Sequence, residues 1–229
     1  MNIISVIVCS RKASKKTAHL DHIAQTIGCD YEYIKIDNSE NKYSITQAYN
    51  KGVNNAKGDI LVFIHEDVFF LTENWGTVLL EKFRKNDSTG LIGVAGTKAL
   101  LNKPGSWASA GKEYHCGQVV HDLKHKDGQF LTMFSYDKTD TKVVAVDGLF
   151  FTVRGTLFER IRFDEQTFRH FHFYDLDICM QVSATHDIIV TYDILLKHLS
   201  AGTFDAVWKQ NAELFINKYK DRLPVFITE

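Results

Sequence analysis

A tripeptide of metal- and proton-binding side chains, His65, Glu66 and Asp67, directly follows an apolar run over residues 60–64. The run starts after a Lys-Gly turn and has the composition of a buried parallel strand. In open α/β sheets, ligands bind just beyond the carboxyl ends of the strands. Carboxylate oxygens at that position suit Mg²⁺ or Mn²⁺ bridged to substrate phosphates. Taken alone, the tripeptide is more typical of a solvated acidic turn at a strand end.

Two more apolar runs, over residues 3–8 and 31–36, are typical of buried strands and end in polar residues. Those residues are Ser10, Arg11, Lys12, Asp37 and Asn38. Lys12 or Arg11 could meet phosphates directly, and Asp37 could accept hydrogen bonds from a ribose or a base. For Asp37, a turn-forming role is an equal alternative. The chain has no GxGxxG or GxxxxGK[ST] stretch, so neither a dinucleotide-binding fold nor a P-loop is supported.

A second group of carboxylates lies at the expected start of a helix over residues 173–184. On that helix, Asp175 shares a face with apolar residues such as Ile178 and Val182, whereas Asp177 points elsewhere. A carboxylate heading an apolar face is partly desolvated and could serve as a general base. The alternative is that both carboxylates only stabilise the helix amino terminus.

Histidines and tryptophans supply further candidates. His198 follows an apolar run and would complete a metal site if it lay beside Asp67. His170 and His172 form an HxH pair, for which ordinary aromatic packing is the alternative to metal binding. Trp107 lies in a non-periodic stretch and could stack on a sugar ring, while Trp208 fits the apolar stripe of the last helix and is expected in the core.

Length and composition fit one large α/β domain of 229 residues. The formal net charge of -1 gives no basic field for nucleic acid or an anionic membrane. Four widely spaced cysteines, without a CxxC pair, indicate reduced thiols and a cytoplasmic protein. No signal-peptide pattern and no apolar stretch of membrane-spanning length occurs, so any membrane association is expected to be peripheral, at the inner face.

The expected elements alternate between strands and helices, which predicts a parallel sheet with helices on both faces. Helices are expected over 15–28, after a capping Ser44, over 73–85 and over 173–184, with a last helix in the stripe from Phe204 to Tyr219. Further strands are expected over 90–95 and 188–192 and near 129–135 and 142–146. Residues 96–130 lack periodicity and are expected to form an irregular lid or binding loop.

Six segments, in order, resemble the family 2 glycosyltransferases and their relatives with the GT-A fold. The first strand and the stretch Ala48–Asp59 are similar to the family's opening strand and to the "RNxG…A.GE" helix. His65-Glu66-Asp67 stands at the DXD position, and Val146-Asp147-Gly148 is similar to the acceptor-side glycine strand. Tyr174-Asp175-Leu176-Asp177 matches the "EDxDL" helix start, and His198 matches the family's late histidine.

The resemblance implies a metal-dependent, inverting hexosyl transfer from a nucleotide-sugar, with a UDP-sugar favoured, to a glycan or glycolipid, as in polysaccharide biosynthesis. It implies a GT-A-like, mostly parallel twisted sheet flanked by helices in a single domain, 1–229. Residues 1–95 would be the nucleotide-sugar-binding half, and residues 96–229 the acceptor-binding half. The assigned residues are Asp175 as base, Asp67 and His198 on Mn²⁺ or Mg²⁺, Ser10, Arg11, Lys12, Asp37, Asn50 and Glu66 on the nucleotide-sugar, and Trp107, Asp147, Gly148, His172, Tyr174 and Asp177 on the acceptor.

Two positions depart from the resembled pattern. His65 replaces the first carboxylate of the DXD motif, and Tyr174 replaces the acidic neighbour of the base. Gln181 is present, but the residues after it do not continue as QxxRW, which favours single additions over polymerisation. A non-catalytic nucleotide-sugar or glycan-binding module therefore stays open. A nucleotidyltransferase is a further alternative, although the loop after the first strand lacks the glycines expected for it.

Overall fold

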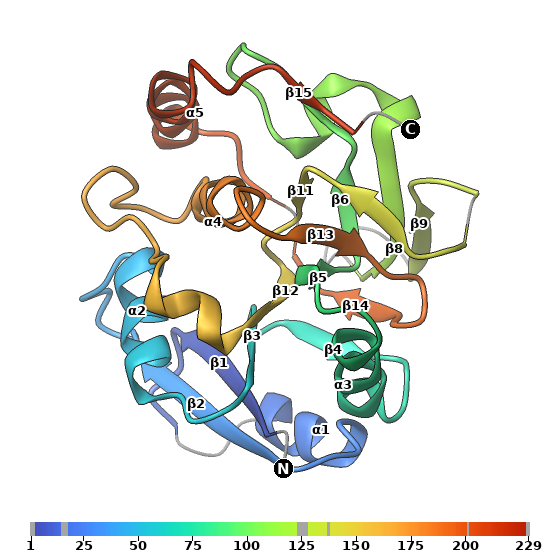
Figure 1. Cartoon of the computed structure of the whole chain (residues 1–229). Coiled ribbons are helices and arrows are strands. Elements are labelled where there is room, and N and C mark those ends of the chain that lie inside the picture. The colour runs from blue at the N-terminus through green and yellow to red at the C-terminus, as the bar shows by residue number, and fades with distance from the viewer. Residues whose placement is uncertain (1–2, 15–17, 123–127, 137, 201, 228–229) are drawn as a thin grey trace.

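Seven strands form the largest sheet of the computed structural model, which describes residues 3–14, 18–122, 128–136, 138–200 and 202–227 (Figure 1). They are β1 (Ile4–Ser10), β2 (Tyr31–Asp37), β3 (Ile60–Ile64), β5 (Thr89–Gly93), β10 (Thr141–Val143), β12 (Phe150–Arg154) and β13 (Asp187–Val190). Their order across the sheet is β10-β13-β5-β12-β3-β1-β2. The predicted strand over residues 60–64 is confirmed to the residue, and all five of its side chains are buried.

Five of the seven strands of this sheet point in the same direction, with β12 and β10 reversed. β1 pairs in parallel with both β2 and β3, and β13 pairs in parallel with β5, which confirms the expectation for continuous apolar runs. β12 runs antiparallel between β3 and β5, and β10 is antiparallel to β13. The single-domain α/β fold with a mostly parallel sheet is therefore confirmed, with one reversed strand inserted near the middle.

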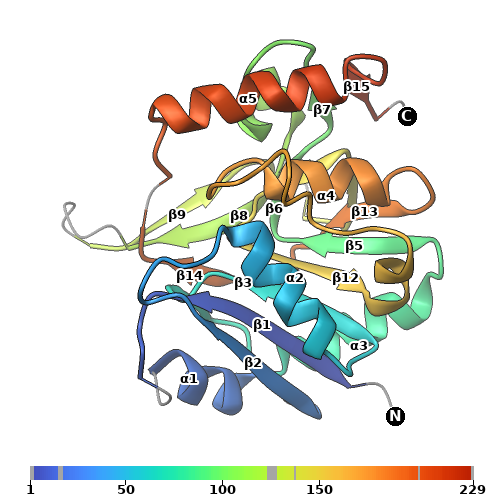
Figure 2. The same ribbon diagram turned by 90° about the vertical axis from the view of Figure 1, so that its left-hand side faces the viewer.

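Helices cover both faces of the sheet (Figure 1). They are α1 (Ala18–Thr26), α2 (Ile45–Asn55), α3 (Trp75–Lys85), α4 (Tyr174–Val182) and α5 (Ala206–Lys218). α1 and α3 pack into one apolar cluster with Val6 of β1, and α2 and α4 pack into another with Phe63 of β3. Figure 2 shows α5 lying over α4. The predicted cap is present, since Ser44 and Gln47 form a reciprocal capping box at the start of α2.

A second, six-stranded sheet is built partly from the segment that the sequence predicts to be irregular. Its order is β11-β6-β8-β14-β4, with β9 paired to β8, and β15 pairs separately with β7. The bounds are β4 (Val68–Phe70), β6 (Ala95–Thr97), β7 (Ala99–Leu100), β8 (His115–His121), β9 (Phe130–Met133), β11 (Ala145–Val146), β14 (Leu196–His198) and β15 (Val225–Phe226).

The expectation of an irregular loop over 96–130 is therefore wrong for much of its described part. β6 and β8 pair with each other, and β8 also pairs with β14 from far along the chain. The sequences of these strands show little alternation between apolar and polar residues. Pairing with neighbouring strands stabilises them, and local periodicity does not report it. Residues 123–127 of the segment lie outside the described residues.

The pairing of β14 with β4 matters most for the site. In the antiparallel ladder, His198 lies opposite Val68, which is the residue after Asp67. The backbone N–H of Leu199 also donates to the carbonyl of Asp67, over 3.2 Å. Among the described residues, no helix combines the length and the apolar composition needed to cross a membrane.

Candidate active site

A cleft of about 1020 Å³ opens at the carboxyl ends of β1, β2 and β3. Residues that directly follow these strands line it, among them Arg11, Asn38 and His65. The convergence of three strand ends, predicted from the sequence, is therefore confirmed. The opposite wall comes from the start of α4, the segment before it and the segment between β14 and α5. Both the amino-terminal and the carboxyl-terminal parts of the chain thus line the cleft.

His65, Asp67 and His198 form a cluster whose ligand atoms all lie within 4.8 Å of one another. The Nε2 atom of His198 is 3.5 Å from Oδ1 of Asp67. Burial acts to raise the pKa of Asp67, but hydrogen bonding from His198 and Ser200 and the nearby imidazoles hold it well below its usual range. An ionised carboxylate between two imidazoles is a donor set for a transition metal. It suits Mn²⁺ better than Mg²⁺, which prefers oxygen ligands alone.

Glu66 lies between His65 and Asp67 in sequence, but its side chain contacts the loop after β1. Its Oε2 accepts a hydrogen bond from the Ser10 hydroxyl over 2.6 Å, and its Oε1 accepts one from the backbone N–H of Arg11 over 3.1 Å. The Ser10 hydroxyl oxygen in turn accepts from the backbone N–H of Lys12. Glu66 thus fixes the basic loop after β1 at the mouth of the cleft, and Ser10 acts through that loop without lining the cleft itself.

Asp175 stands at the start of α4 and faces the cleft. Its Oδ2 accepts from the backbone N–H of Gly148 and its Oδ1 from that of Leu176, each over 2.9 Å. Burial, with the nearby charge of Asp147, raises the pKa of Asp175 to about 7. No described Lys or Arg side chain contacts this carboxylate. It therefore has the environment that the sequence predicts for a general base, with a pKa near neutrality.

The acceptor-side candidates Trp107, Asp147, Gly148, His172 and Tyr174 all line the cleft. The indole Nε1 of Trp107 donates to Oδ2 of Asp147 over 2.9 Å, which orients the indole. Trp208, expected in the core, is instead half-buried on the cleft wall beside Phe204, with ring centroids 5.0 Å apart.

Besides Ser10, three predicted site residues lie outside the cleft lining. Asp37 is exposed at the end of β2, where its side chain accepts from the backbone N–H of Ser39. Its neighbour Asn38 lines the cleft instead. Asn50 is buried, and its amide donates to the carbonyl of Phe163 over 2.8 Å, so it joins α2 to the segment before α4.

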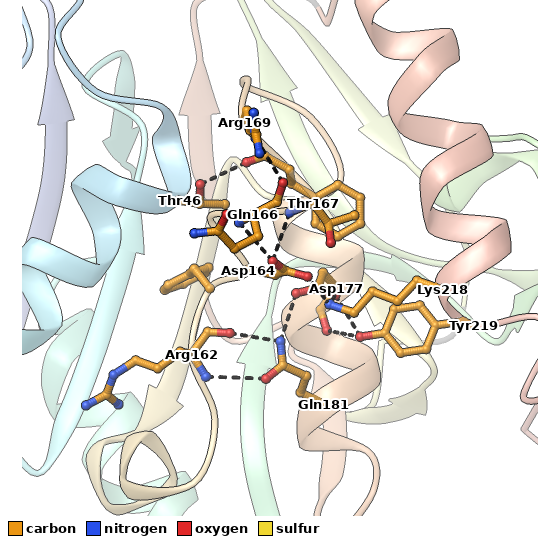
Figure 3. A network of polar contacts seen from close by, with 12 residues as sticks. Thr46, Arg162, Asp164, Gln166, Thr167, Arg169, Asp177, Gln181, Lys218 and Tyr219 are labelled. Carbon is orange, nitrogen blue, oxygen red and sulfur yellow. Dashed lines mark hydrogen bonds and ion pairs between the residues drawn. The ribbon is translucent and has the colours of Figure 1, made fainter.

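Asp177 is the third, and Figure 3 shows why it lies elsewhere. Its side chain is fully buried and accepts hydrogen bonds from Lys218 over 2.5 Å, Tyr219 over 2.7 Å and Gln181 over 2.8 Å. These contacts fasten α4 to α5. The position of Asp177 gives no support to the predicted contact with an acceptor, because its oxygens are enclosed by protein groups.

Sequence reasoning missed Lys42 and Arg169 on the cleft wall. Lys42, Arg169, His170 and Phe171 all line it. His170 and Phe171 are exposed, so ordinary packing does not account for the HxH segment as a whole. The signal that could have found Arg169 is its position just before the carboxylates of α4, where an exposed basic and aromatic stretch has no role in the core.

Comparisons with known proteins found similar solved structures and a matching family. GalNAc-T7, solved with UDP, GalNAc and Mn²⁺, superposes with a TM-score of 0.56 at 12% identity, over 96% of this chain and 48% of that chain. The chain therefore spans about half the length of that protein. A197 from STIV aligns with a TM-score of 0.48 at 12% identity, over 88% of this chain and 87% of that chain. No curated protein matches the sequence.

A sequence profile described as "Glycosyltransferase like family" matches residues 4–229. This match covers nearly the whole chain, and the structural likeness shows that the fold is that of the GT-A glycosyltransferases. The chain belongs to the glycosyltransferase-like family.

Proposed function

We propose that this protein transfers a sugar from a nucleotide-sugar, with a UDP-sugar favoured, to a hydroxyl of a glycan or glycolipid, with inversion at the sugar carbon. One observation carries the proposal. A single cleft contains both a cluster of metal-binding side chains, His65, Asp67 and His198, and a carboxylate with a pKa near neutrality, Asp175. The cleft lies where open α/β sheets bind ligands.

The nucleotide-sugar would lie along residues 1–95. His65, Asp67 and His198 would hold a divalent ion, for which the donor set favours Mn²⁺, and the ion would neutralise charge on the leaving diphosphate. Arg11 and Lys12, exposed at the mouth of the cleft, would meet phosphate oxygens. The GalNAc-T7 structure that shares this fold contains UDP and Mn²⁺, which supports UDP and Mn²⁺ as the first ligands to test.

The acceptor would enter from the side of residues 96–229. Asp175 would take the proton of the acceptor hydroxyl while the hydroxyl oxygen bonds to the anomeric carbon and the bond to the diphosphate breaks. Attack from the face opposite the leaving group inverts the carbon. The backbone N–H groups of Gly148 and Leu176 hold the carboxylate for this step. Trp107 and His172 on the cleft wall would contact acceptor sugars.

Thermal stabilisation by a panel of nucleotides and nucleotide-sugars, with and without Mn²⁺, tests this proposal. A ligand that binds the folded state raises the apparent stability by mass action. We expect a Mn²⁺-dependent shift with UDP or a UDP-sugar that Asp67→Ala abolishes. Asp175→Asn is the matched control, because it leaves the metal cluster intact and should keep the shift.

No shift with any nucleotide in folded protein would contradict the transferase and leave a glycan-binding module as the better reading. A shift with a nucleoside triphosphate and not with UDP-sugars would instead favour a nucleotidyltransferase.

A further inference from the structure

We infer that Tyr174 is a positioning residue that fixes the tautomer of His65, so that His65 carries its proton on Nε2 and presents the lone pair of Nδ1 for a metal ion. The inference rests on the proposed function, in which His65, Asp67 and His198 hold the ion. It assigns a role to the two positions at which the chain departs from the resembled family pattern. Residues 65 and 174 are 109 positions apart in sequence, and their side chains meet in the fold.

The hydrogen bonds around the Tyr174 hydroxyl decide the tautomer. This hydroxyl lies 3.1 Å from the carbonyl oxygen of Gly148 and 2.8 Å from Nε2 of His65. A carbonyl only accepts, so the one hydroxyl proton goes to Gly148. The hydroxyl oxygen must then accept a hydrogen bond from the N–H of Nε2. Both contacts are satisfied only when Nε2 of His65 is protonated, which in the neutral imidazole leaves Nδ1 with its lone pair.

The other ring nitrogen is available for a ligand. Among the described residues, no hydrogen bond to Nδ1 of His65 is present, although the ring lies 5.7 Å from that of His198, centroid to centroid. Metal-binding histidines commonly donate their second ring N–H to a protein acceptor, which sets the tautomer and the ring orientation. Tyr174 supplies such an acceptor.

Packing holds the Tyr174 hydroxyl in place. Tyr174 is 3% exposed, and its ring contacts the rings of Tyr49 and Phe171, with centroids 5.6 and 5.9 Å away. Gly148 must be glycine here, because a Cβ atom at that position would lie 2.4 Å from the Tyr174 hydroxyl and 3.0 Å from Oδ2 of Asp175. A larger residue would therefore displace both side chains.

Gly148 also connects the two halves of the chemistry. Its N–H donates to Asp175, and its carbonyl accepts from Tyr174, which in turn contacts His65. Gly148 thus fixes the position of the Asp175 carboxylate directly and that of His65, in the metal cluster, through Tyr174. A phenol can accept the hydrogen bond from His65 without adding a negative charge beside Asp175, which a carboxylate at position 174 would do.

Two measurements on metal-free protein test the inference. Nitrogen chemical shifts of the His65 ring by NMR should show Nε2 protonated and Nδ1 unprotonated in the wild type. In Tyr174→Phe, which removes only the hydroxyl, we expect a mixture of tautomers. Nδ1 protonation in the wild type would overturn the inference without reference to any variant.

Calorimetric titration with Mn²⁺ alone gives the second readout. Loss of a hydrogen-bond partner behind a metal ligand typically weakens metal binding by about 10–100-fold, and we expect such a loss for Tyr174→Phe. Tyr33→Phe is the matched control, because the Tyr33 hydroxyl also contacts a histidine, His19, over 2.9 Å, but lies outside the cleft lining. It should leave the Mn²⁺ affinity unchanged.

The two failures are distinguishable. Equal Mn²⁺ affinity of the wild type and folded Tyr174→Phe would overturn the inference and leave the proposed function standing. Absence of Mn²⁺ binding by the wild type itself would overturn both, since the metal site would then be lost from the proposed function.

Discussion

Two carboxylates stand two residues apart on α4, and their surroundings differ completely. Asp177 is fully buried and surrounded by Lys218, Tyr219 and Gln181 (Figure 3). Asp175 is half-buried, opens into the cleft and, among the described residues, accepts hydrogen bonds only from backbone N–H groups. Burial raises the pKa of both, to about 7 for Asp175. A buried carboxylate with a cation and neutral donors serves the structure, whereas one without a cation at an open cleft can exchange a proton with a substrate.

The strongest effect on stability should come from removing the cation of the Asp177 network. Lys218→Met leaves a fully buried carboxylate without its charge partner, and we expect a loss of about 3 kcal/mol. Equilibrium unfolding in urea measures this loss. Lys42→Met is the control, because its ion pair with Glu40 is exposed and should contribute less than about 1 kcal/mol. Equal losses in the two variants would mean that the network has no special structural role.

Removing the charge of Asp175 should raise the stability of the protein, whereas removing that of Lys218 should lower it. The folded pKa of about 7 lies above the unfolded value of 3.8, so the native state binds more protons between these values and the ionised carboxylate costs stability as the pH rises. Asp175→Asn should therefore stabilise the protein on the order of 1–3 kcal/mol above pH 7. The gain should shrink as the pH falls toward 4. Unfolding curves at both ends of that range measure it, and a loss at high pH would contradict a desolvated, unpaired Asp175.

Turnover should decrease gradually as the pH falls, and this effect ranks below the two changes in stability. A general base must be deprotonated, so the rate should fall by about tenfold per pH unit below the pKa of Asp175, about 7. Initial rates across this range, with saturating nucleotide-sugar, provide the profile. Lys218→Met, if folded, should keep the same midpoint. A rate that stays flat down to pH 5 would exclude Asp175 as the base.

The sequence predicts much of the fold because the main signals are local. The strand over residues 60–64 is a closed apolar run, and Ser44 with Gln47 forms a cap within one helical turn. β8 is different, since it depends on β6 and β14, and no local periodicity reports such partners. The antiparallel insertion of β12 between β3 and β5 is also a property of the whole sheet.

For the site, the sequence shows where a residue lies along its strand or helix. It does not show which distant residues the side chain contacts. The strand ends predicted the cluster that could hold a metal ion, and helix periodicity separated Asp175 from Asp177. Periodicity could not show that Lys218 encloses Asp177 or that Asn50 bridges to Phe163. Nor could it show that His65 meets Tyr174, because these contacts join segments more than 40 residues apart.

Turnover of the two Asp→Asn variants at positions 175 and 177 is the decisive measurement, made with the UDP-sugar that stabilises the wild type. We expect Asp175→Asn to bind the nucleotide-sugar as the wild type does and to turn over about 10²–10⁴-fold more slowly. Asp177→Asn, at a temperature where it is folded, should keep most of the activity. Full activity of Asp175→Asn, or equal losses in the two variants, would contradict the assignment of Asp175 as the base.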